Sequence, residues 1–128
     1  MGARSVAVRV VLLALAVAAT VWAARSYRAV YVGGGSMAPA LARGDFAVVR
    51  RGPAAVSEGD VVLVAKAGWP VGVLHRVVEV GLDDTFVLRG DANPTNDRDA
   101  VAPQAVMGVV TIVVPTGGVL AAVEALTR

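Results

Sequence analysis

A long uncharged stretch near the start of the sequence limits the folds open to this chain. Residues 10–24 carry no charged side chain, and the five residues before them add one charge, Arg9. About twenty apolar residues span the hydrocarbon core of a bilayer as a helix. Arg9 lies near one end, where its side chain can reach the headgroups, and Trp22 lies near the other, where aromatic rings favour the interface. The stretch predicts one membrane helix over about residues 6–25.

The same stretch also fits a cleaved signal peptide, because Arg4 and Arg9 precede or begin the apolar run and small residues end it. Charge alone does not orient a membrane helix here. Arg4 and Arg9 lie toward one end, and Arg25 and Arg28 lie toward the other. The sequence leaves both questions open.

Composition excludes several kinds of protein. Hydrophobic residues make up 56% of the 128 residues and charged residues 17%, which is too apolar for a disordered chain. There is no cysteine, so disulfides, thiol catalysis and cysteine-bound zinc are excluded. With a single histidine, one chain cannot supply a site that needs two or three histidine ligands.

The net charge of +2 is divided unevenly along the chain. Residues 1–52 carry seven arginines and one acid, whereas residues 53–128 carry five basic and nine acidic residues. The basic half also holds the apolar stretch, which suits a membrane surface better than a nucleic acid. We therefore expect a lipid bilayer, and no nucleic acid, as a partner.

After Tyr31 the helical pattern gives way to short β-branched runs separated by Gly, Pro and Asp. Such runs at close spacing predict a mainly β fold, as a small antiparallel sheet or a barrel-like one. The predicted strands are 46–50, 61–65, 71–80, 85–89 and 106–114. The chain would then comprise a membrane anchor (1–28), a β-rich domain (29–114) and a short tail (115–128).

The tail contains an apolar run at residues 119–126, interrupted by Glu124, that is too short to cross a bilayer. We expect a short amphipathic or interfacial helix there. The alternative is a second membrane helix beginning near Val109, although it would have to contain Pro115 and two glycines.

Ser36 follows three glycines directly, at the point where the predicted anchor ends. Glycines allow the backbone to turn tightly and to approach another chain closely. A serine on such a turn can supply a nucleophilic hydroxyl and, from its own N–H, a donor to an oxyanion. A glycine-rich linker that happens to end in serine is the plainer interpretation.

His75 lies within the predicted strand 71–80, where alternation places it on one face with Val73 and Val77. A lone histidine between valines is commonly a core or edge residue. A serine nucleophile nevertheless needs a base, and histidine is the usual one near neutral pH. Lys66, the single lysine, is the rival base, but it would have to be buried to serve.

The polar loop at residues 89–99 imitates a calcium-binding loop in its alternation of polar residues. The imitation fails because Asn96 stands where such a loop needs glycine, and Ala102 where it needs glutamate. Arg-Gly-Asp occurs at 43–45 and again at 89–91, and Gly-Asp at turn-to-strand junctions accounts for both without an adhesion role.

Several short motifs follow the predicted helix in a specific order. They are Ser36-Met37-Ala38-Pro39, Arg43-Gly44-Asp45, Gly59-Asp60-Val61-Val62, His75-Arg76-Val77, and Gly90-Asp91-Ala92-Asn93 with Asp97-Arg98. Together they resemble the motifs of type I signal peptidases, the membrane-bound serine peptidases that trim secreted preproteins. The resemblance extends to about Gly108. A histidine before Arg-Val resembles the endoplasmic-reticulum, archaeal and sporulation-type branch rather than the bacterial lysine branch.

The resemblance implies a role for each matched residue. Ser36 would be the nucleophile, His75 the general base, and Asp97 the acid that orients the histidine. Asp91 would hold the loop, although Asp91 and Asp97 could exchange these roles. Asn93 and Arg98 would belong to the same supporting loop.

Around the nucleophile, the resemblance implies an oxyanion hole and substrate contacts formed by Gly34, Gly35, Ser36, Met37 and Pro39. Many members carry a hydroxyl residue where this chain has Gly34. The Ser36 N–H would then be the main oxyanion donor, and loss of a second donor can lower the rate about 10²–10³-fold.

The implied protein is a serine endopeptidase held in the cell membrane by one span, with its β-rich catalytic domain on the extracytoplasmic side. Its partners would be the signal peptides of preproteins and the bilayer, and whether it has accessory subunits stays open. The implied chemistry needs no metal or cofactor. Two alternatives remain. One is a serine–lysine peptidase that uses Ser36 and Lys66, and the other is a membrane-anchored β-module that binds peptides without cutting them.

Overall fold

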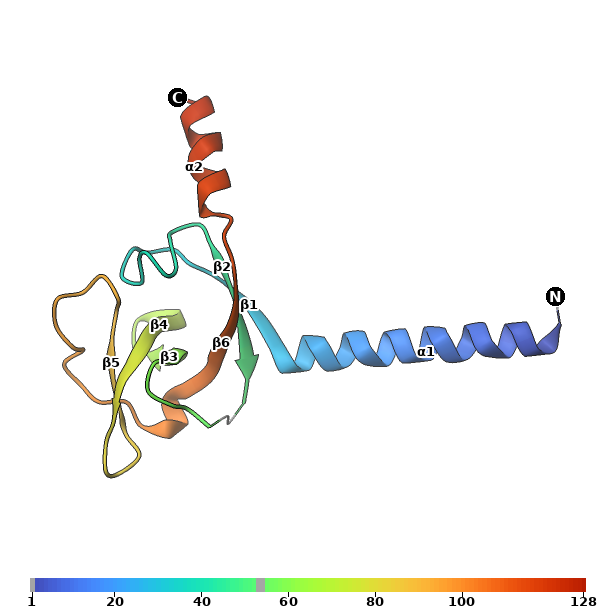
Figure 1. Ribbon diagram of the computed structural model, residues 1–128, viewed down its shortest axis with the longest axis horizontal. Coiled ribbons are helices and arrows are strands. Elements are labelled where there is room, and N and C mark those ends of the chain that lie inside the picture. Colours follow the sequence, from blue (N-terminus) through green and yellow to red (C-terminus); the bar gives the residue numbers. More distant parts are fainter. Residues whose placement is uncertain (1, 53–54) are drawn as a thin grey trace.

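The computed structural model describes residues 2–52 and 55–128 and consists of one long helix, a six-stranded sheet and a short second helix (Figure 1). The elements in chain order are α1 (Ala3–Ser26), β1 (Tyr27–Tyr31), β2 (Phe46–Arg51), β3 (Val61–Lys66), β4 (Trp69–Val80), β5 (Phe86–Arg89), the 3-10 turn η1 (Pro103–Ala105), β6 (Val106–Val114) and α2 (Gly117–Leu126).

The predicted apolar helix is present as α1. Within the described residues it is the one helix long and apolar enough to cross a membrane, and none of its apolar window is buried against the rest of the chain. Figure 1 shows it projecting away from the sheet. Its length and composition suit a membrane span, and a helix that is apolar on all sides is usually found in a protein core or in a membrane. At the C-terminal end of α1 the rings of Trp22 and Tyr27 meet edge to face, with their centroids 5.9 Å apart.

The predicted antiparallel sheet is confirmed, with strand order β1-β2-β6-β3-β4-β5. The barrel-like expectation needs correction, because within the described residues no pairing joins the edge strands β1 and β5. These edge strands are only five and four residues long, and β5 pairs only with the second half of β4. The sheet curls, with bulges near Val48, Val64 and Val77, but it stays open.

Five of the six strands lie where the β-branched runs predict them, whereas β1 was not predicted. It begins at Tyr27, directly after α1, with no glycine or proline between the two elements. Its pairing with β2 aligns Tyr27 with Arg50 and Tyr31 with Phe46. The chain therefore passes from the apolar helix straight into an edge strand of the sheet.

Both faces of the curled sheet carry apolar cores. One cluster contains Val62, Val77 and Leu88, and a second contains Val49 and Leu63. Val62 and Leu63 are neighbours in β3, so their side chains point to opposite faces of the sheet. A third cluster forms where Met37 and Leu41, 2% and 1% exposed, pack beside Ala47. The turn that begins at Ser36 is therefore fixed to the sheet by two buried side chains.

The tail forms the predicted short helix, α2, and the alternative of a membrane helix from Val109 is wrong because Val106–Val114 is a strand between β2 and β3. Asp45, from the first Arg-Gly-Asp motif, is buried and accepts hydrogen bonds from the N–H groups of Ala42 (2.9 Å) and Gly117 (2.8 Å). A carboxylate at a helix start is a favourable partner for its free N–H groups. This motif therefore joins α2 to the sheet.

Candidate active site

The only histidine lies in the middle of β4, with its ring against the carboxylate of Asp97. His75 pairs with Val62 of β3 and is 7% exposed. Its Nδ1 lies 2.5 Å from Oδ2 of Asp97, which belongs to the polar loop after β5. The backbone N–H of Asp97 donates to the carbonyl of Leu88, at 2.7 Å. This bond ties the carboxylate to β5 and holds it in place against the imidazole.

This contact determines which nitrogen of the imidazole can act as a base. A carboxylate at Nδ1 favours the tautomer with its proton there, so Nδ1–H donates to Asp97 and Nε2 keeps a free lone pair. Among the described residues no hydrogen bond involves Nε2, and no fully buried side-chain nitrogen or oxygen lacks a partner. Nε2 therefore keeps some contact with solvent and could accept a proton.

Ser36 lies in a turn that the polar loop contacts directly. Its carbonyl accepts a hydrogen bond from the N–H of Ala92, at 2.9 Å. Gly90 passes so close that a Cβ placed on it would lie 2.6 Å from that carbonyl oxygen and 3.1 Å from the Cβ of Ser36. One loop thus contacts Ser36 through Gly90 and Ala92, and His75 through Asp97.

The hydroxyl of Ser36 forms no hydrogen bond with His75 in the described part of the chain. Catalytic hydrogen bonds are often long or poorly aligned before substrate binds, so this leaves the pair as candidates. Ser36 itself is half-buried, with an exposed glycine on its N-terminal side.

The second carboxylate of the loop, Asp91, takes a different partner. Its two oxygens accept from Nε and Nη2 of Arg76, both at 2.8 Å, and Nη1 of Arg76 donates to the carbonyl of Gly59 at 2.7 Å. These bonds to Arg76 lower the pKa of the Asp91 carboxyl below its ordinary value of 3.8, and the same contact raises the pKa of Arg76. A bidentate pair of this kind fixes the start of the loop.

Arg76 was not among the predicted site residues. It stands next to His75 in β4, but alternation turns it to the other face of the strand. The signal available was the second Arg-Gly-Asp motif, because β5 pairs with β4 and Arg76 aligns with Arg89, two residues before Asp91. The strand register brings Arg76 near that carboxylate.

The remaining predicted site residues lie around the same turn and loop. Gly34 and Gly35 are exposed, and a Cβ on either would meet nothing within 4 Å. The side chain of Met37 is part of the core and is not available to a ligand. Pro39 is exposed and follows a cis peptide bond.

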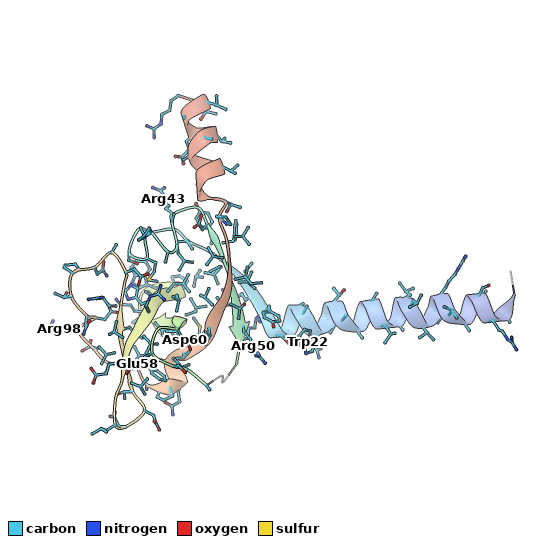
Figure 2. The ribbon with its side chains drawn as sticks, in the orientation of Figure 1. Trp22, Arg43, Arg50, Glu58, Asp60 and Arg98 are labelled. Carbon is cyan, nitrogen blue, oxygen red and sulfur yellow. The ribbon has the colours of Figure 1, made fainter. Side chains whose placement is uncertain are left out.

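Asn93 and Arg98 belong to the polar loop. The side-chain nitrogen of Asn93 lies 2.7 Å from the position of a Cβ on Gly90, and therefore close to the Ser36 turn. Arg98 is exposed at the edge of the molecule (Figure 2).

Lys66, the rival base, lies at the end of β3 in the hairpin that leads into β4, and it is exposed. It is four residues from Val62, the partner of His75, which corresponds to about 13 Å along a strand. Within residues 2–52 and 55–128, no three His, Cys, Asp or Glu side chains gather closely enough to hold a metal ion.

Two comparisons with known proteins show which family the chain belongs to. Residues 1–113 match the Peptidase S24-like family. A segment of 76 residues is 33% identical to the signal peptidase complex catalytic subunit SEC11 of Komagataella phaffii, covering 53% of this chain and 44% of that protein. The match thus spans less than half the length of this curated relative. The family match covers most of the chain, which therefore belongs to the Peptidase S24-like family as a type I signal peptidase-like protein.

Proposed function

We propose that this chain is a membrane-anchored serine endopeptidase that removes signal peptides from secreted preproteins, with Ser36 as nucleophile, His75 as general base and Asp97 as its orienting acid. The observation that carries the proposal is that one polar loop contacts both residues. The N–H of Ala92 donates to the Ser36 carbonyl at 2.9 Å, and Oδ2 of Asp97 lies 2.5 Å from Nδ1 of His75. Likeness to a signal peptidase catalytic subunit supports the choice of substrate.

In the proposed reaction, the Ser36 hydroxyl attacks the scissile carbonyl carbon while Nε2 of His75 takes its proton. The oxyanion that forms accepts a hydrogen bond from the Ser36 N–H. The protonated imidazole, stabilised by Asp97, then gives its proton to the leaving amine as the carbon–nitrogen bond breaks. Water, activated by the same nitrogen, hydrolyses the resulting ester and restores Ser36.

Two unpaired strand edges near these residues could bind an extended substrate. The β4–β5 pairing begins at Arg76, so within the described residues the preceding half of β4 has one free edge. The outer edge of β1, which leads toward Ser36, is also free. Exposed strand edges bind extended peptides by adding a strand, and pockets for alternate side chains provide specificity.

The proposed location follows from α1. Ser36 lies ten residues after Ser26, the last residue of the helix. If α1 spans the bilayer, the nucleophile lies near the surface at which a signal peptide leaves its own membrane segment. We propose that the sheet lies on the extracytoplasmic side and that the histidine places the chain nearer the endoplasmic-reticulum-type branch than the lysine branch.

The test is cleavage of a preprotein by the full-length chain in detergent. Replacing Ser36 with alanine should abolish turnover, because the hydroxyl is the nucleophile, and His75→Ala should be nearly as damaging. Lys66→Ala is the matched control for the rival base and should retain activity. Wild-type turnover by Ser36→Ala would contradict the proposal.

A second candidate is a peptide-binding module that does not cut. Gly34, in place of a hydroxyl residue, and the missing hydrogen bond between Ser36 and His75 are the observations in its favour. A serine-directed covalent probe separates the two functions. Labelling that is lost in Ser36→Ala supports the enzyme, whereas peptide binding without labelling supports the module.

A further inference from the structure

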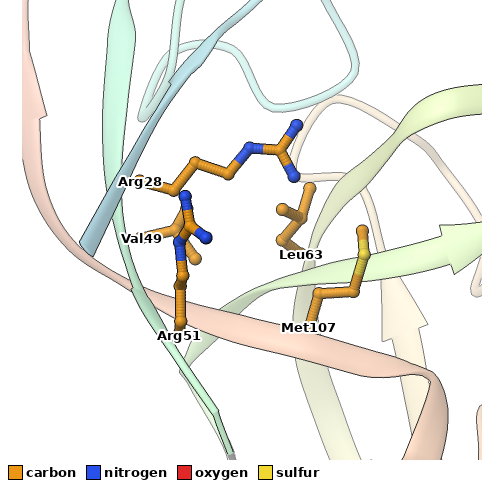
Figure 3. Close-up of a pocket in the computed structure, with 5 residues that line it drawn as sticks. All are labelled: Arg28, Val49, Arg51, Leu63 and Met107. Carbon is orange, nitrogen blue, oxygen red and sulfur yellow. The ribbon is translucent and has the colours of Figure 1, made fainter. Parts of the chain in front are cut away.

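A cavity of about 170 Å³ lies on the sheet at a place that none of the candidate catalytic residues lines. Its walls come from four strands, and Figure 3 shows the side chains that face it. They are Arg28 of β1, Val49 and Arg51 of β2, Leu63 of β3 and Met107 of β6. Leu63 follows Val62, the partner of His75, so alternation turns this wall to the opposite face from the imidazole.

The cavity combines two positive charges with an apolar floor. The guanidinium groups of Arg28 and Arg51 both reach into it (Figure 3). Neither belongs to an ion pair within the described residues, where the salt bridges are His75–Asp97 and Arg76–Asp91. Met107, which is half-buried, supplies the accessible apolar lining of the same space, since Val49 and Leu63 are each only 1% exposed. Such a site fits a ligand that has an anionic group beside a hydrocarbon portion.

Arginine is the side chain best suited to a phosphate, because its planar fork of donors matches two phosphate oxygens. The cavity is smaller than the roughly 300–1,000 Å³ usual for whole drug-sized ligands. A cavity of this size suits a fragment of a ligand, such as a phosphate and its nearest carbons, rather than a whole ligand.

The position of the cavity along the chain identifies the source of such a fragment. Arg28 lies two residues after the end of α1, and the register of β1 with β2 aligns Tyr27 with Arg50, so Arg51 lies opposite the helix end. Arg25, in the last turn of α1, and Arg50, which is labelled in Figure 2, add two more positive charges at this junction. If α1 spans the bilayer, this is the level of the lipid headgroups.

We propose that Arg28 and Arg51 bind the phosphate of an anionic phospholipid headgroup, with the half-buried Met107 against its glycerol and first acyl carbons. Bound lipid would fix the height and tilt of the sheet on the membrane surface. This inference rests on α1 lying in the bilayer, as the proposed function has it, but it does not depend on the chemistry of Ser36.

The test is lipid binding by the full-length chain in uncharged detergent, followed by native mass spectrometry. Phosphatidylglycerol is titrated in one arm, phosphatidylcholine in a second and inorganic phosphate in a third. We expect one saturable phosphatidylglycerol, bound at least tenfold more tightly than phosphatidylcholine, and no retained inorganic phosphate. Equal retention of inorganic phosphate would contradict a lipid site, and so would the lack of any saturable lipid.

A matched pair of variants separates a built site from diffuse attraction. Arg28→Gln with Arg51→Gln should weaken phosphatidylglycerol binding at least tenfold. Arg25→Gln with Arg50→Gln removes the same charge at the same level but outside the cavity. This variant should change the affinity for phosphatidylglycerol about twofold or less. Equal losses in the two variants would overturn the proposal.

Two further measurements guard against trivial results. If the double glutamine variant does not fold, Arg28→Lys with Arg51→Lys keeps the charge and removes the planar forks, and binding should still fall several-fold. Ser36→Ala should bind phosphatidylglycerol as the wild type does. Failure of the lipid site would therefore be distinguishable from failure of the proposed catalysis.

Discussion

Two carboxylates six residues apart in one loop meet different partners. Asp97 accepts a hydrogen bond from the imidazole of His75, and Asp91 accepts hydrogen bonds from Nε and Nη2 of Arg76. The resemblance to signal peptidases favoured Asp97 beside the histidine, because Asp97 directly precedes an arginine, but it left an exchange with Asp91 open. Sequence does not reveal how a loop folds back, and here the return depends on the backbone bond between Asp97 and Leu88.

At Asp97, we predict a large loss of turnover with little loss of stability. Asp97→Asn keeps the size of the side chain but removes the charge that selects the tautomer and stabilises the imidazolium. We expect kcat for preprotein cleavage to fall about 10²–10⁴-fold. A thermal unfolding curve that stays close to the wild-type curve would show that the loss is catalytic. Wild-type kcat in this variant would contradict the proposed role.

At Asp91, we predict the reverse, a loss of stability that depends on pH. Asp91→Asn breaks a pair of charge-assisted hydrogen bonds, which is worth about 1–3 kcal/mol. Because Arg76 lowers the pKa of Asp91 in the folded chain, the pair stabilises the fold fully above the ordinary value of 3.8. The stabilisation is lost as pH falls through the lowered pKa.

The measurement is Tm in detergent from neutral pH down to pH 2 for the wild type, Asp91→Asn and the control Asp99→Asn, an exposed acid of the same loop. The gap between wild type and Asp91→Asn should be constant near neutral pH and close only under strongly acidic conditions. A gap that closes already at pH 6 would point to a different titrating group.

The short β-branched runs predicted strands β2 to β6 because each run is bounded by turn residues. They did not predict β1, because no turn residue separates it from α1. Nor could they predict an open sheet, since closure depends on whether the edge strands β1 and β5 meet in space, which the spacing of the runs does not specify. The Ser36 turn and the polar loop are far apart in the sequence, and their contact depends on the packing of Met37 and the close approach of Gly90.

That close approach leads to a prediction about the Ser36 turn. Gly90→Ala would place a Cβ 2.6 Å from the Ser36 carbonyl oxygen, so the turn and the loop would have to separate. A displacement of about 1 Å can cost about 10²-fold in rate. We expect kcat/KM to fall by that order. Gly118→Ala, where a Cβ meets nothing within 4 Å, is the control and should keep wild-type activity. Equal activity in both variants would contradict the importance of this contact.

An apolar helix runs directly into an edge strand that leads to the candidate nucleophile (Figure 1). Enzyme and proposed substrate would then share one membrane surface. Confinement of both partners raises their effective concentration without any new contact. Anchoring should therefore matter for a preprotein held in the bilayer and hardly at all for a short peptide in water.

This reasoning predicts a change in a ratio of rates. Leu13→Arg with Ala14→Arg places two charges at the centre of α1, each costing about 2.5–3.5 kcal/mol on insertion. We expect this variant to be extracted from vesicles at alkaline pH, and to lose cleavage of a vesicle-bound preprotein at least tenfold more than cleavage of a soluble peptide. Leu13→Ala with Ala14→Leu conserves the composition of the helix and should behave as the wild type in both assays. An unchanged ratio would contradict a role for α1 as an anchor. If N-terminal sequencing shows that the mature chain begins beyond Ala24, then α1 is a leader that is removed.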